Sequence, residues 1–567
     1  MNDVDRKKII SNDYADLIAE YSDDQMNLSN FSNETINFID PKKFAIVYIP
    51  VNKVTQQFSQ EQDYSIITKL FGLVDTTILD EMGVKKVQNI PSLDLNGQGV
   101  LLGFVDTGIE YTNPLFKNAD NTTRILSIWD QSIENMQASS DIFYYGTEYS
   151  ENQINEALKS ETPLSIVPST DQIGHGTMLA GLAGGSSIEA SDFIGVVPLS
   201  QFVIVKLKPA KANLKQLLLV PEDAICYQEN DILFGITYLL NVANQLKKPI
   251  AICIGLGTNQ GPHDGRSPLS SLIYIKSNRV GTATVVAAGN EGNTGHHYYG
   301  EVDPKIGSNL VEIKVGEGES GFLMELWGNL PGSYSIDITS PNGEYVPRIL
   351  PKLHESRSIK FTFEKTTILV DYFIVEAQTG DQLILFRFKD PTPGIWKLKV
   401  YAGKISSGFH IWLPIRGFIT ENTKFINPNP YTTITCPAYS LTAITATAYN
   451  HKDQSIYPSA GRGFSRVNLI KPDLAAPGVN VYSPLLSNEF GPKSGTSIAA
   501  ALTTGVSAML LEWGIVKNNY PTMNSQQVKK FLIRGVEQNV NITYPNREWG
   551  FGTLDIYRTF ENLQGKL

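Results

Sequence analysis

Four apolar runs, each ending in small or turn-forming residues, constrain the fold of this chain more than any other feature. They are GVLLGFVDTGI at 99–109, QFVIVKLK at 201–208, PIAICIGLG at 249–257 and ATVVAAGN at 283–290. Segments with apolar residues at helical spacing separate them, as in residues 231–246. Continuous apolar strands that alternate with helices predict a parallel sheet with helices on both faces, and therefore an α/β fold.

Residues 301–425 have a different texture, with short strands, turn signals and no convincing helix. Apolar and polar residues alternate in SYSIDIT at 333–339 and in GIWKLKVYA at 394–402, and PNG at 341–343 is a turn sequence. This pattern predicts an antiparallel β-sandwich of the jelly-roll type. Because the α/β pattern resumes afterwards, we interpret the sandwich as a domain inserted into the α/β domain.

The N-terminal region forms a further unit. It begins polar and helical in character, continues with a strand-like run at 44–51, and ends with the apolar residues 64–74. We expect a small α/β unit over residues 1–76. The larger α/β domain then comprises residues 77–300 and 426–567, interrupted by the inserted domain at 301–425.

The charge balance narrows the possible partners. Of the 567 residues, 47 are Lys or Arg and 57 are Asp or Glu, so the formal net charge is −10. An acidic chain without a basic block is a poor candidate for binding nucleic acid or an anionic membrane surface. No apolar run is long enough to predict a membrane span. The N-terminus lacks the pattern of a secretory signal, and the three cysteines of the chain do not indicate a disulfide framework. We therefore expect an intracellular setting.

Three residues have the side chains and positions that nucleophilic hydrolysis requires. Asp106 ends the first apolar strand, His175 begins a helix rich in small residues, and Ser497 lies at a Gly-containing turn into an apolar helix. A serine needs a base for its proton, histidine has a pKa near neutrality, and a carboxylate fixes the imidazole tautomer. Since groups at the carboxyl ends of parallel strands share one sheet edge, we expect Asp106, His175 and Ser497 to form a catalytic triad.

Asn290 closes the strand sequence VVAAGN at the same predicted edge. Its side-chain amide can donate a hydrogen bond to an oxyanion, together with the backbone N–H of Ser497 at the start of its helix. Asn290 is therefore the predicted oxyanion donor.

At this point the sequence resembles the subtilisin-like serine proteases. VDTG at 105–108, GHGTMLAG at 174–181, AAGN at 287–290 and SGTSIAA at 494–500 are similar to the four signature segments of that family, in its order of Asp, His and Ser. KPDLAAPGVNVYSP at 471–484 and REWGFGTLDIY at 547–557 are similar to two further landmarks. The resemblance covers about 95–300 and 425–567. It departs at Ala501, where many members carry Pro, and in the long insertion before Ser497.

The resemblance also implies how substrate is held. GLGTNQG at 255–261 follows a strand and is similar to the substrate-edge segment of the family. We expect an extended peptide to pair with Gly255, Leu256 and Gly257 through its main chain, with the glycines leaving room for it. A simple strand-to-loop turn is the alternative.

A finer resemblance is to the Csp germination proteases of clostridia. Three features resemble that group: the lack of a secretory signal, the segment FYYGTEYSENQINEALKS before the histidine, and the β-rich insertion before the serine. The resemblance implies an N-terminal prodomain that acts as a folding chaperone, is self-cleaved and stays bound, and a jelly roll that clamps the assembly. It also implies a protein substrate, the zymogen of a spore cortex-lytic enzyme, and a location in the cell or spore. We place the processing site near Thr76, within 72–80.

Other functions and sites remain as alternatives. A regulatory, pseudoprotease-like binding protein and a general degradative intracellular subtilisin are the competing functions. No metal or other cofactor is expected. His296 and His297 are interpreted as part of a polar loop rather than a metal site. Calcium is conceivable at NADNTT, residues 118–123, but a solvated turn is favoured there because no ligand pattern is recognisable.

Overall fold

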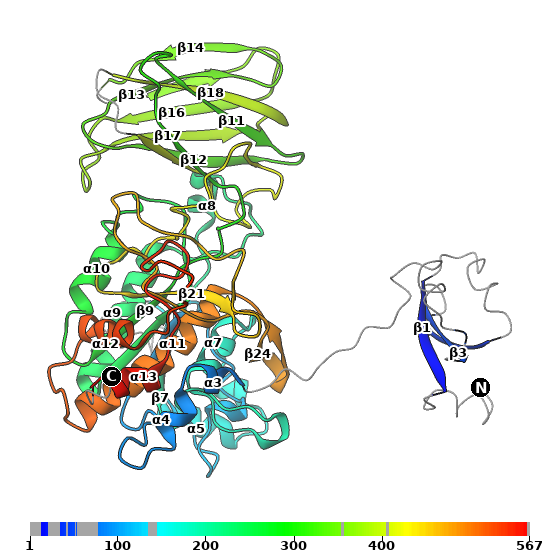
Figure 1. The fold of residues 1–567 in the computed structure, drawn as a ribbon, viewed down its shortest axis with the longest axis vertical. Coiled ribbons are helices and arrows are strands. Elements are labelled where there is room, and N and C mark those ends of the chain that lie inside the picture. The colour runs from blue at the N-terminus through cyan, green and yellow to red at the C-terminus, as the bar shows by residue number, and fades with distance from the viewer. Residues whose placement is uncertain are drawn as a thin grey trace. The chain divides into compact units, whose positions relative to one another are not determined.

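The computed structural model in Figure 1 describes residues 13–20, 34–40, 44–50, 53, 77–133, 145–352, 356–403 and 408–563. The chain divides into two compact units, Met1–Leu73 and Val74–Leu567. Each unit is described by itself.

The described part of the first unit is a three-stranded antiparallel sheet in the order β1-β3-β2, formed by β1 (Tyr14–Glu20), β2 (Thr35–Asp40) and β3 (Phe44–Pro50). The predicted strand at 44–51 is confirmed. The predicted helical beginning is wrong at β1, which pairs with β3 from Tyr14 opposite Pro50 to Glu20 opposite Phe44. Pairing between distant segments overrides local helix propensity here. The apolar residues 64–74 and the proposed processing residue Thr76 lie outside the described residues.

A nine-stranded, mostly parallel sheet forms the centre of the second unit, in the order β22-β21-β9-β8-β4-β7-β5-β6, with β23 paired to β21. The four predicted apolar strands are all present, as β4 (Leu101–Asp106), β7 (Gln201–Lys206), β8 (Ile250–Ile254) and β9 (Thr282–Ala287). The other members are β5 (Ile125–Asp130), β6 (Thr147–Ser150), β21 (Ile444–Asn450), β22 (Ser455–Ile456) and β23 (Leu474–Pro477).

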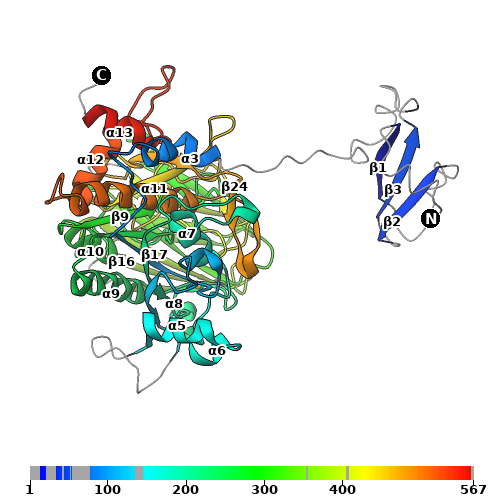
Figure 2. The ribbon, with the colours of Figure 1, turned by 90° about the horizontal axis from the view of Figure 1, so that it is seen from below.

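Helices cover both faces of this sheet, as Figures 1 and 2 show. Leu102 and Phe104 of β4 belong to one core cluster, with α7 (His175–Gly184) and α11 (Thr496–Leu511). Leu101 and Val105 belong to a second cluster, with α9 (Glu229–Leu246) and α10 (Pro268–Lys276). Because alternate side chains of a strand point to opposite faces, every residue of β4 is buried, and its sequence is apolar throughout until Asp106.

The remaining helices of the second unit are mostly short. They are α3 (Thr77–Glu81), α4 (Val84–Gln88), α5 (Glu151–Lys159), α6 (Pro163–Ile166), α8 (Ala212–Leu218), α12 (Ser525–Gly535) and α13 (Ile556–Leu563). A two-stranded ribbon of β24 (Val481–Pro484) and β25 (Phe490–Lys493) lies between β23 and α11 in the sequence.

Between β9 and β21 the chain forms two antiparallel sheets that share one apolar core, seen at the top of Figure 1. The six-stranded sheet contains β10 (His297–Gly300), β12 (Gly321–Gly328), β15 (Ser356–Lys360), β16 (Thr367–Phe373), β17 (Gln382–Lys389) and β19 (Phe409–Trp412). The five-stranded sheet contains β11 (Asn309–Val315), β13 (Tyr334–Thr339), β14 (Tyr345–Ile349), β18 (Gly394–Ala402) and β20 (Lys424–Phe425). In β18, Trp396, Leu398 and Val400 are fully buried and the two intervening lysines are exposed, so the predicted alternation is confirmed.

One helix in the described part of the chain is long and apolar enough, by length and composition, to cross a membrane. It spans Thr496–Val516, and 89% of its most apolar window is buried inside the fold. From the sequence we predicted that no apolar run was long enough to span a membrane, and that prediction missed this helix. Its apolar surface is covered by the sheet and by α7, as expected of a central core helix.

Candidate active site

Three chemically complementary side chains meet at the carboxyl edge of the parallel sheet. Asp106 is the last residue of β4, His175 is the first residue of α7, and Ser497 is the second residue of α11. His175 Nδ1 lies 2.7 Å from Asp106 Oδ1, and His175 Nε2 lies 3.2 Å from Ser497 Oγ. The structure therefore brings together all three residues of the predicted triad, in the order carboxylate, imidazole, hydroxyl.

The exposure of these side chains suits attack on an external substrate. The Asp106 side chain is 2% exposed and that of His175 is 28% exposed. Ser497 is buried but lies within the first turn of α11, where backbone N–H groups have no intrahelical partner. A buried carboxylate can hold the inner ring nitrogen while the outer one faces the serine.

The turn after β4 holds Asp106 in place. Asp106 Oδ1 also accepts a hydrogen bond of 2.8 Å from the backbone N–H of Thr107, and Thr107 Oγ1 accepts one of 2.9 Å from the N–H of Gly176. A Cβ on Gly176 would lie 2.2 Å from the carbonyl oxygen of Gly108, so any side chain would push the helix away from the turn. Glycine at this position lets His175 approach the carboxylate.

Asp171 is a site residue that the sequence interpretation missed. It is buried, and its Oδ1 accepts a hydrogen bond of 2.8 Å from the N–H of Gly174, which has a left-handed φ of 88°. Its Oδ2 accepts bonds from the N–H and the hydroxyl of Thr177, at 2.9 and 2.8 Å. Asp171 thus fixes the turn that delivers His175. An acidic residue shortly before the start of a helix was the available signal, since such residues cap helix N-termini.

The pKa of His175 is raised above its ordinary value of 6.5. Burial lowers the pKa, but the adjacent Asp106 carboxylate raises it through its charge and its hydrogen bond, and the charge of Asp171 adds to this. A higher pKa makes the imidazole a stronger proton acceptor, at the cost of needing a higher pH to be neutral.

Asn290 lies next to Ser497. Its Oδ1 accepts hydrogen bonds from the N–H and the hydroxyl of Thr496, at 3.1 and 3.2 Å, which leaves its Nδ2 free to point elsewhere. A Cβ placed on Gly495 would lie 3.4 Å from Ser497 Oγ, 3.8 Å from Asn290 Nδ2 and 3.9 Å from Ser497 N. The nucleophile and two N–H donors therefore surround one small space, which is where an oxyanion needs its donors.

The predicted substrate segment runs away from the triad. A Cβ on Gly255 would lie 3.0 Å from His175 Cε1 and 3.3 Å from Asp106 Oδ2, so a side chain here would displace the imidazole. On one side the segment is bridged to the loop after the insertion, through Thr258 and Cys436, with N–O distances of 3.0 and 2.9 Å. Within the described residues, the backbone N–H groups of Gly255, Leu256 and Gly257 form no hydrogen bond. They are available to a main-chain partner.

The inserted sandwich contacts the loops on both sides of this site. Glu325 of β12 accepts a hydrogen bond of 2.9 Å from the N–H of Gly261, just beyond the substrate segment. On the other side, Glu291 follows Asn290 and accepts a hydrogen bond of 3.1 Å from the N–H of Arg416. The sandwich therefore helps to hold the two loops that flank Ser497.

The interpretation of His296 and His297 as a polar loop is wrong at His297, which begins β10, and both side chains are buried. His296 Nδ1 lies 2.9 Å from Glu291 Oε2, and His297 Nε2 lies 2.9 Å from His410 Nδ1, beside the ring of Trp412. The insertion packs on this loop and removes it from solvent. In the ranges that the structure describes, no group of three or more His, Cys, Asp or Glu side chains is arranged to hold a metal ion. In the turn at residues 118–123, Asn118 Nδ2 donates to Thr122 Oγ1, and the Thr122 hydroxyl donates to Asp120 Oδ1.

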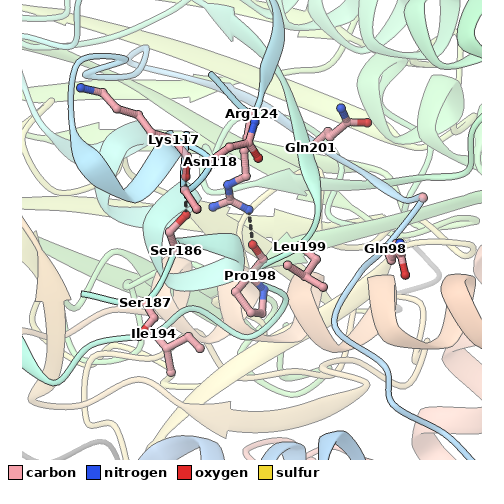
Figure 3. A pocket seen from close by; sticks show the side chains of 12 residues that line it. Gln98, Lys117, Asn118, Arg124, Ser186, Ser187, Ile194, Pro198, Leu199 and Gln201 are labelled. Atoms are coloured by element: carbon pink, nitrogen blue, oxygen red, sulfur yellow. Dashed lines mark hydrogen bonds between the residues drawn. The ribbon is translucent and has the colours of Figure 1, made fainter. Parts of the chain in front are cut away.

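A cavity of about 480 Å³ lies elsewhere, near the amino ends of β4 and β7, and is drawn in Figure 3. At its centre the Arg124 guanidinium donates to backbone carbonyl oxygens, including those of Leu115 at 2.7 Å and Ser200 at 2.8 Å. The cation is thereby used to tie loops together. This cavity lies at the opposite end of the strands from Ser497 and does not belong to the site.

Comparisons with known proteins show what this chain is similar to. The model of the subtilase family matches residues 97–309 and 421–552, which flank the sandwich. The solved CspB protease of Clostridium perfringens is 32% identical with a TM-score of 0.77, over 86% of this chain and 98% of that one. The PII-type proteinase of Lactococcus lactis subsp. cremoris is 22% identical over 551 residues, covering 82% of this chain and 26% of that protein. The PIII-type proteinase of strain SK11 is 22% identical over 539 residues, covering 82% and 25%. This chain spans about a quarter of the length of these curated relatives.

Proposed function

This chain belongs to the subtilase family of serine peptidases, and from that premise we propose that Asp106, His175 and Ser497 catalyse peptide-bond hydrolysis. The observation that carries the proposal is the hydrogen-bonded series from Asp106 Oδ1 through the two ring nitrogens of His175 to Ser497 Oγ. The family and its solved relative are peptidases, so the substrates are proteins.

In the first step, Ser497 Oγ attacks the scissile carbonyl carbon while His175 Nε2 takes the hydroxyl proton. Asp106 keeps the proton of the imidazole on Nδ1 and stabilises the imidazolium that forms. The negative charge that develops on the carbonyl oxygen is met by Asn290 Nδ2 and the backbone N–H of Ser497. His175 then returns its proton to the leaving amine, and water releases the acyl group by the same steps in reverse.

The substrate is held in extended form along Gly255, Leu256 and Gly257. The free backbone N–H groups of this segment support such pairing, because an added strand needs main-chain donors at an unoccupied edge. The segment begins beside His175, so a peptide paired with it passes the nucleophile.

The biological role is limited processing. The enzyme cleaves its own prodomain, residues 1–76, near Thr76, and then activates a protein zymogen, that of a spore cortex-lytic enzyme. The similarity to the CspB protease of Clostridium perfringens over nearly the whole of that chain supports this role over bulk degradation. Retention of all three triad side chains in hydrogen-bonding contact supports an active enzyme over a regulatory binding protein.

N-terminal sequencing of the purified protein beside its Ser497→Ala variant tests both parts. We expect the wild type to begin near residue 77 and the variant to remain uncleaved. Ser494→Ala is the matched control, because Ser494 is close in sequence but only accepts a hydrogen bond from the N–H of Asn480. A fluorophosphonate should label the wild type and the control at Ser497. An unlabelled wild type would show that the chain is a binding protein, and cleavage of the Ser497→Ala variant at the same bond would exclude self-processing.

A further inference from the structure

The loop at residues 208–228, which contains α8 and is called the α8 loop below, keeps its apolar side chains partly in solvent. In the part of the chain that the structure describes, no residue of α8 is buried, although the helix carries three leucines. Leu217 is 56% exposed, and Ile225 beyond the helix is 64% exposed. The other apolar side chains of this group are half-buried, namely Leu214, Leu218, Leu219 and Val220. Apolar side chains gathered in one exposed loop, rather than scattered singly, mark a site of interaction.

Hydrogen bonds within the α8 loop fix its shape. Lys215 Nζ donates to the carbonyl oxygens of Glu222, at 2.8 Å, and Ala224, at 2.7 Å. The N–H of Ala210 donates to the carbonyl oxygen of Cys226 at 2.9 Å and so joins the two ends of the loop. The loop therefore holds its leucines at the surface in a set arrangement. A surface that is already ordered loses little conformational freedom when it binds a partner.

The α8 loop connects the sandwich with the triad. At its middle, Leu219 packs on the start of β12, since a Cβ on Gly321 would lie 3.5 Å from Leu219 Cδ1. At its end, burial raises the pKa of Tyr227 above its ordinary value of 10, and the charges of Asp106 and Asp171 raise it further. The Tyr227 side chain therefore lies within electrostatic reach of the catalytic carboxylate.

The substrate segment connects the same two places. Gly255 lies beside His175, and Gly261 donates its hydrogen bond to Glu325 in the middle of β12. Figure 1 shows α8 beside β12, between the sandwich and the rest of the α/β part. The α8 loop and the substrate segment thus both run from the triad to β12. A peptide that pairs with the substrate segment and continues in the same direction reaches the α8 loop.

We propose that the α8 loop is an exosite, a binding surface outside the catalytic centre, for apolar side chains of the protein substrate on the N-terminal side of the scissile bond. This role rests on the proposed function, because the triad and the substrate segment place the peptide. The paired half is the N-terminal, acyl half, since it stays attached to Ser497 after the amine has left and must remain aligned for water.

The reach of an extended chain sets which substrate residues contact the exosite. Gly261 lies four residues beyond Gly257, and an extended chain advances about 3.3 Å per residue, so residues at about P5–P8 reach the α8 loop. Burying leucine or isoleucine side chains there against Leu217 and Ile225 removes apolar surface of both partners from water. The enzyme then recognises an apolar stretch that lies several residues before the cut.

The test uses the mature enzyme and two peptides that share, from P4 to P2′, the sequence around the self-cleavage bond. One peptide has Leu at each of P5–P8 and the other has Ser there. We expect the wild type to favour the Leu peptide in kcat/KM by about tenfold or more. Leu217→Ser and Ile225→Ser should each lower this ratio to about threefold or less, and both positions are exposed enough to leave the fold intact.

Leu350→Ser is the matched control. Leu350 is 55% exposed and follows β14, at the far end of the sandwich from α8 in Figure 1. Its ratio should equal that of the wild type within about twofold. A wild type that cleaves both peptides equally well, or a ratio that Leu217→Ser and Ile225→Ser leave unchanged, would overturn the proposal.

The remaining outcomes identify other occupants or separate the two proposals. If Leu217→Ser keeps the peptide ratio but loses copurified residues 1–76, the surface belongs to the prodomain; if it instead lowers the sedimentation coefficient, the surface belongs to a second copy of the chain. Either result overturns the exosite. A wild type that a fluorophosphonate labels at Ser497 but that ignores P5–P8 is an active subtilase without this exosite. A wild type that is not labelled refutes the proposed function, and the exosite with it.

Discussion

The parallel α/β part and the inserted sandwich of the second unit both contain fully buried apolar cores, but they place their buried polar groups differently. In the α/β part, Asp106, Asp171 and Ser497 are gathered at the carboxyl edge of one sheet. In the sandwich, Glu325 contacts Gly261 of the α/β part, and Asp381 Oδ2 lies 2.6 Å from Arg466 Nη2, also of the α/β part. These two buried carboxylates of the sandwich are thus at the junction.

The difference follows from the two architectures. All strands of a parallel sheet end on the same side, so the loops that follow them meet and can assemble several side chains. Antiparallel strands end on alternate sides, and their polar residues alternate outward into solvent. We therefore expect substitutions at the sheet edge to change the chemistry with little effect on stability, and substitutions in the sandwich core to do the reverse.

Asp106→Asn should have the largest effect of the sheet-edge changes. The neutral amide holds the imidazole in the wrong tautomer, which lowers kcat by a factor on the order of 10⁴ in another serine protease with the same triad. The loss of charge also removes the main influence that raises the pKa of His175, while burial still lowers it. Activity requires neutral His175, so the acid limb of kcat/KM should lie above pH 6.5 in the wild type and move to lower pH in the variant.

Asp171→Asn serves as the matched variant, because Asp171 adds to the raised pKa of His175 without contacting its ring. We expect a smaller loss of kcat and a smaller shift of the acid limb. The measurement is the profile of kcat/KM against pH for the wild type and the two variants. An acid limb of Asp106→Asn at the same pH as that of the wild type, or at a higher pH, would contradict our account of the pKa of His175.

Trp396→Ala should have the largest effect in the sandwich. Trp396 is fully buried, with its ring 5.1 Å from that of Phe361 and 5.6 Å from that of Phe388. Its truncation leaves a cavity and should lower the free energy of unfolding by about 3–5 kcal/mol, with kcat/KM of the folded enzyme within about threefold of the wild type. Phe363→Ala, at a side chain 82% exposed, should change stability by less than about 0.5 kcal/mol. A Trp396→Ala enzyme that stays folded but loses its activity would contradict the expectation that the sandwich core affects stability and not the chemistry.

Asn290→Ala should lower kcat by a factor of about 10²–10³, a magnitude measured for the corresponding kind of donor in a subtilisin rather than derived from this structure. Asn290 is exposed, so the free energy of unfolding should change little. Thr496→Val removes one of the two hydrogen bonds that orient the amide and leaves the amide in place, so its loss of kcat should be smaller. Equal losses in the two variants would assign the effect to the shape of the loop rather than to the donor.

The sequence predicted what depends on local pattern. The four apolar strands and the residues at their ends, Asp106 and Asn290, could be placed because apolar runs with terminal turns indicate buried parallel strands. The packing of Thr435 against Gly257 and Gly289 could not, because these residues are distant in the sequence and adjacent only in the fold. The buried state of His297 was missed for the same reason, since its partner His410 lies on another strand of the insertion.

Glu325→Gln changes a residue at the junction between the sandwich and the α/β part. It should have the smallest effect of these substitutions, but it discriminates best between the two regions. Burial raises the pKa of Glu325, and the N–H groups of Trp327 and Gly261 offset this only in part. Because the folded state then holds its proton more tightly than the unfolded state, the contribution of Glu325 to stability falls as the pH rises from its ordinary pKa of 4.5 through the raised value. Glutamine keeps the shape and an acceptor, so the free energy of unfolding should depend less steeply on pH in this window.

The same variant measures whether the sandwich influences the cleft. Weakening the bond to Gly261 loosens the loop beyond the substrate segment, so we expect KM to rise about two- to fivefold with kcat nearly unchanged, since the triad is untouched. Glu312→Gln is the control, because Glu312 is half-exposed on β11 and only pairs with Lys397 at 3.9 Å. If both variants behave like the wild type, the sandwich acts on stability alone. If Glu325→Gln instead lowers kcat strongly, the division of labour between the two regions is wrong, because the insertion then takes part in positioning the catalytic groups.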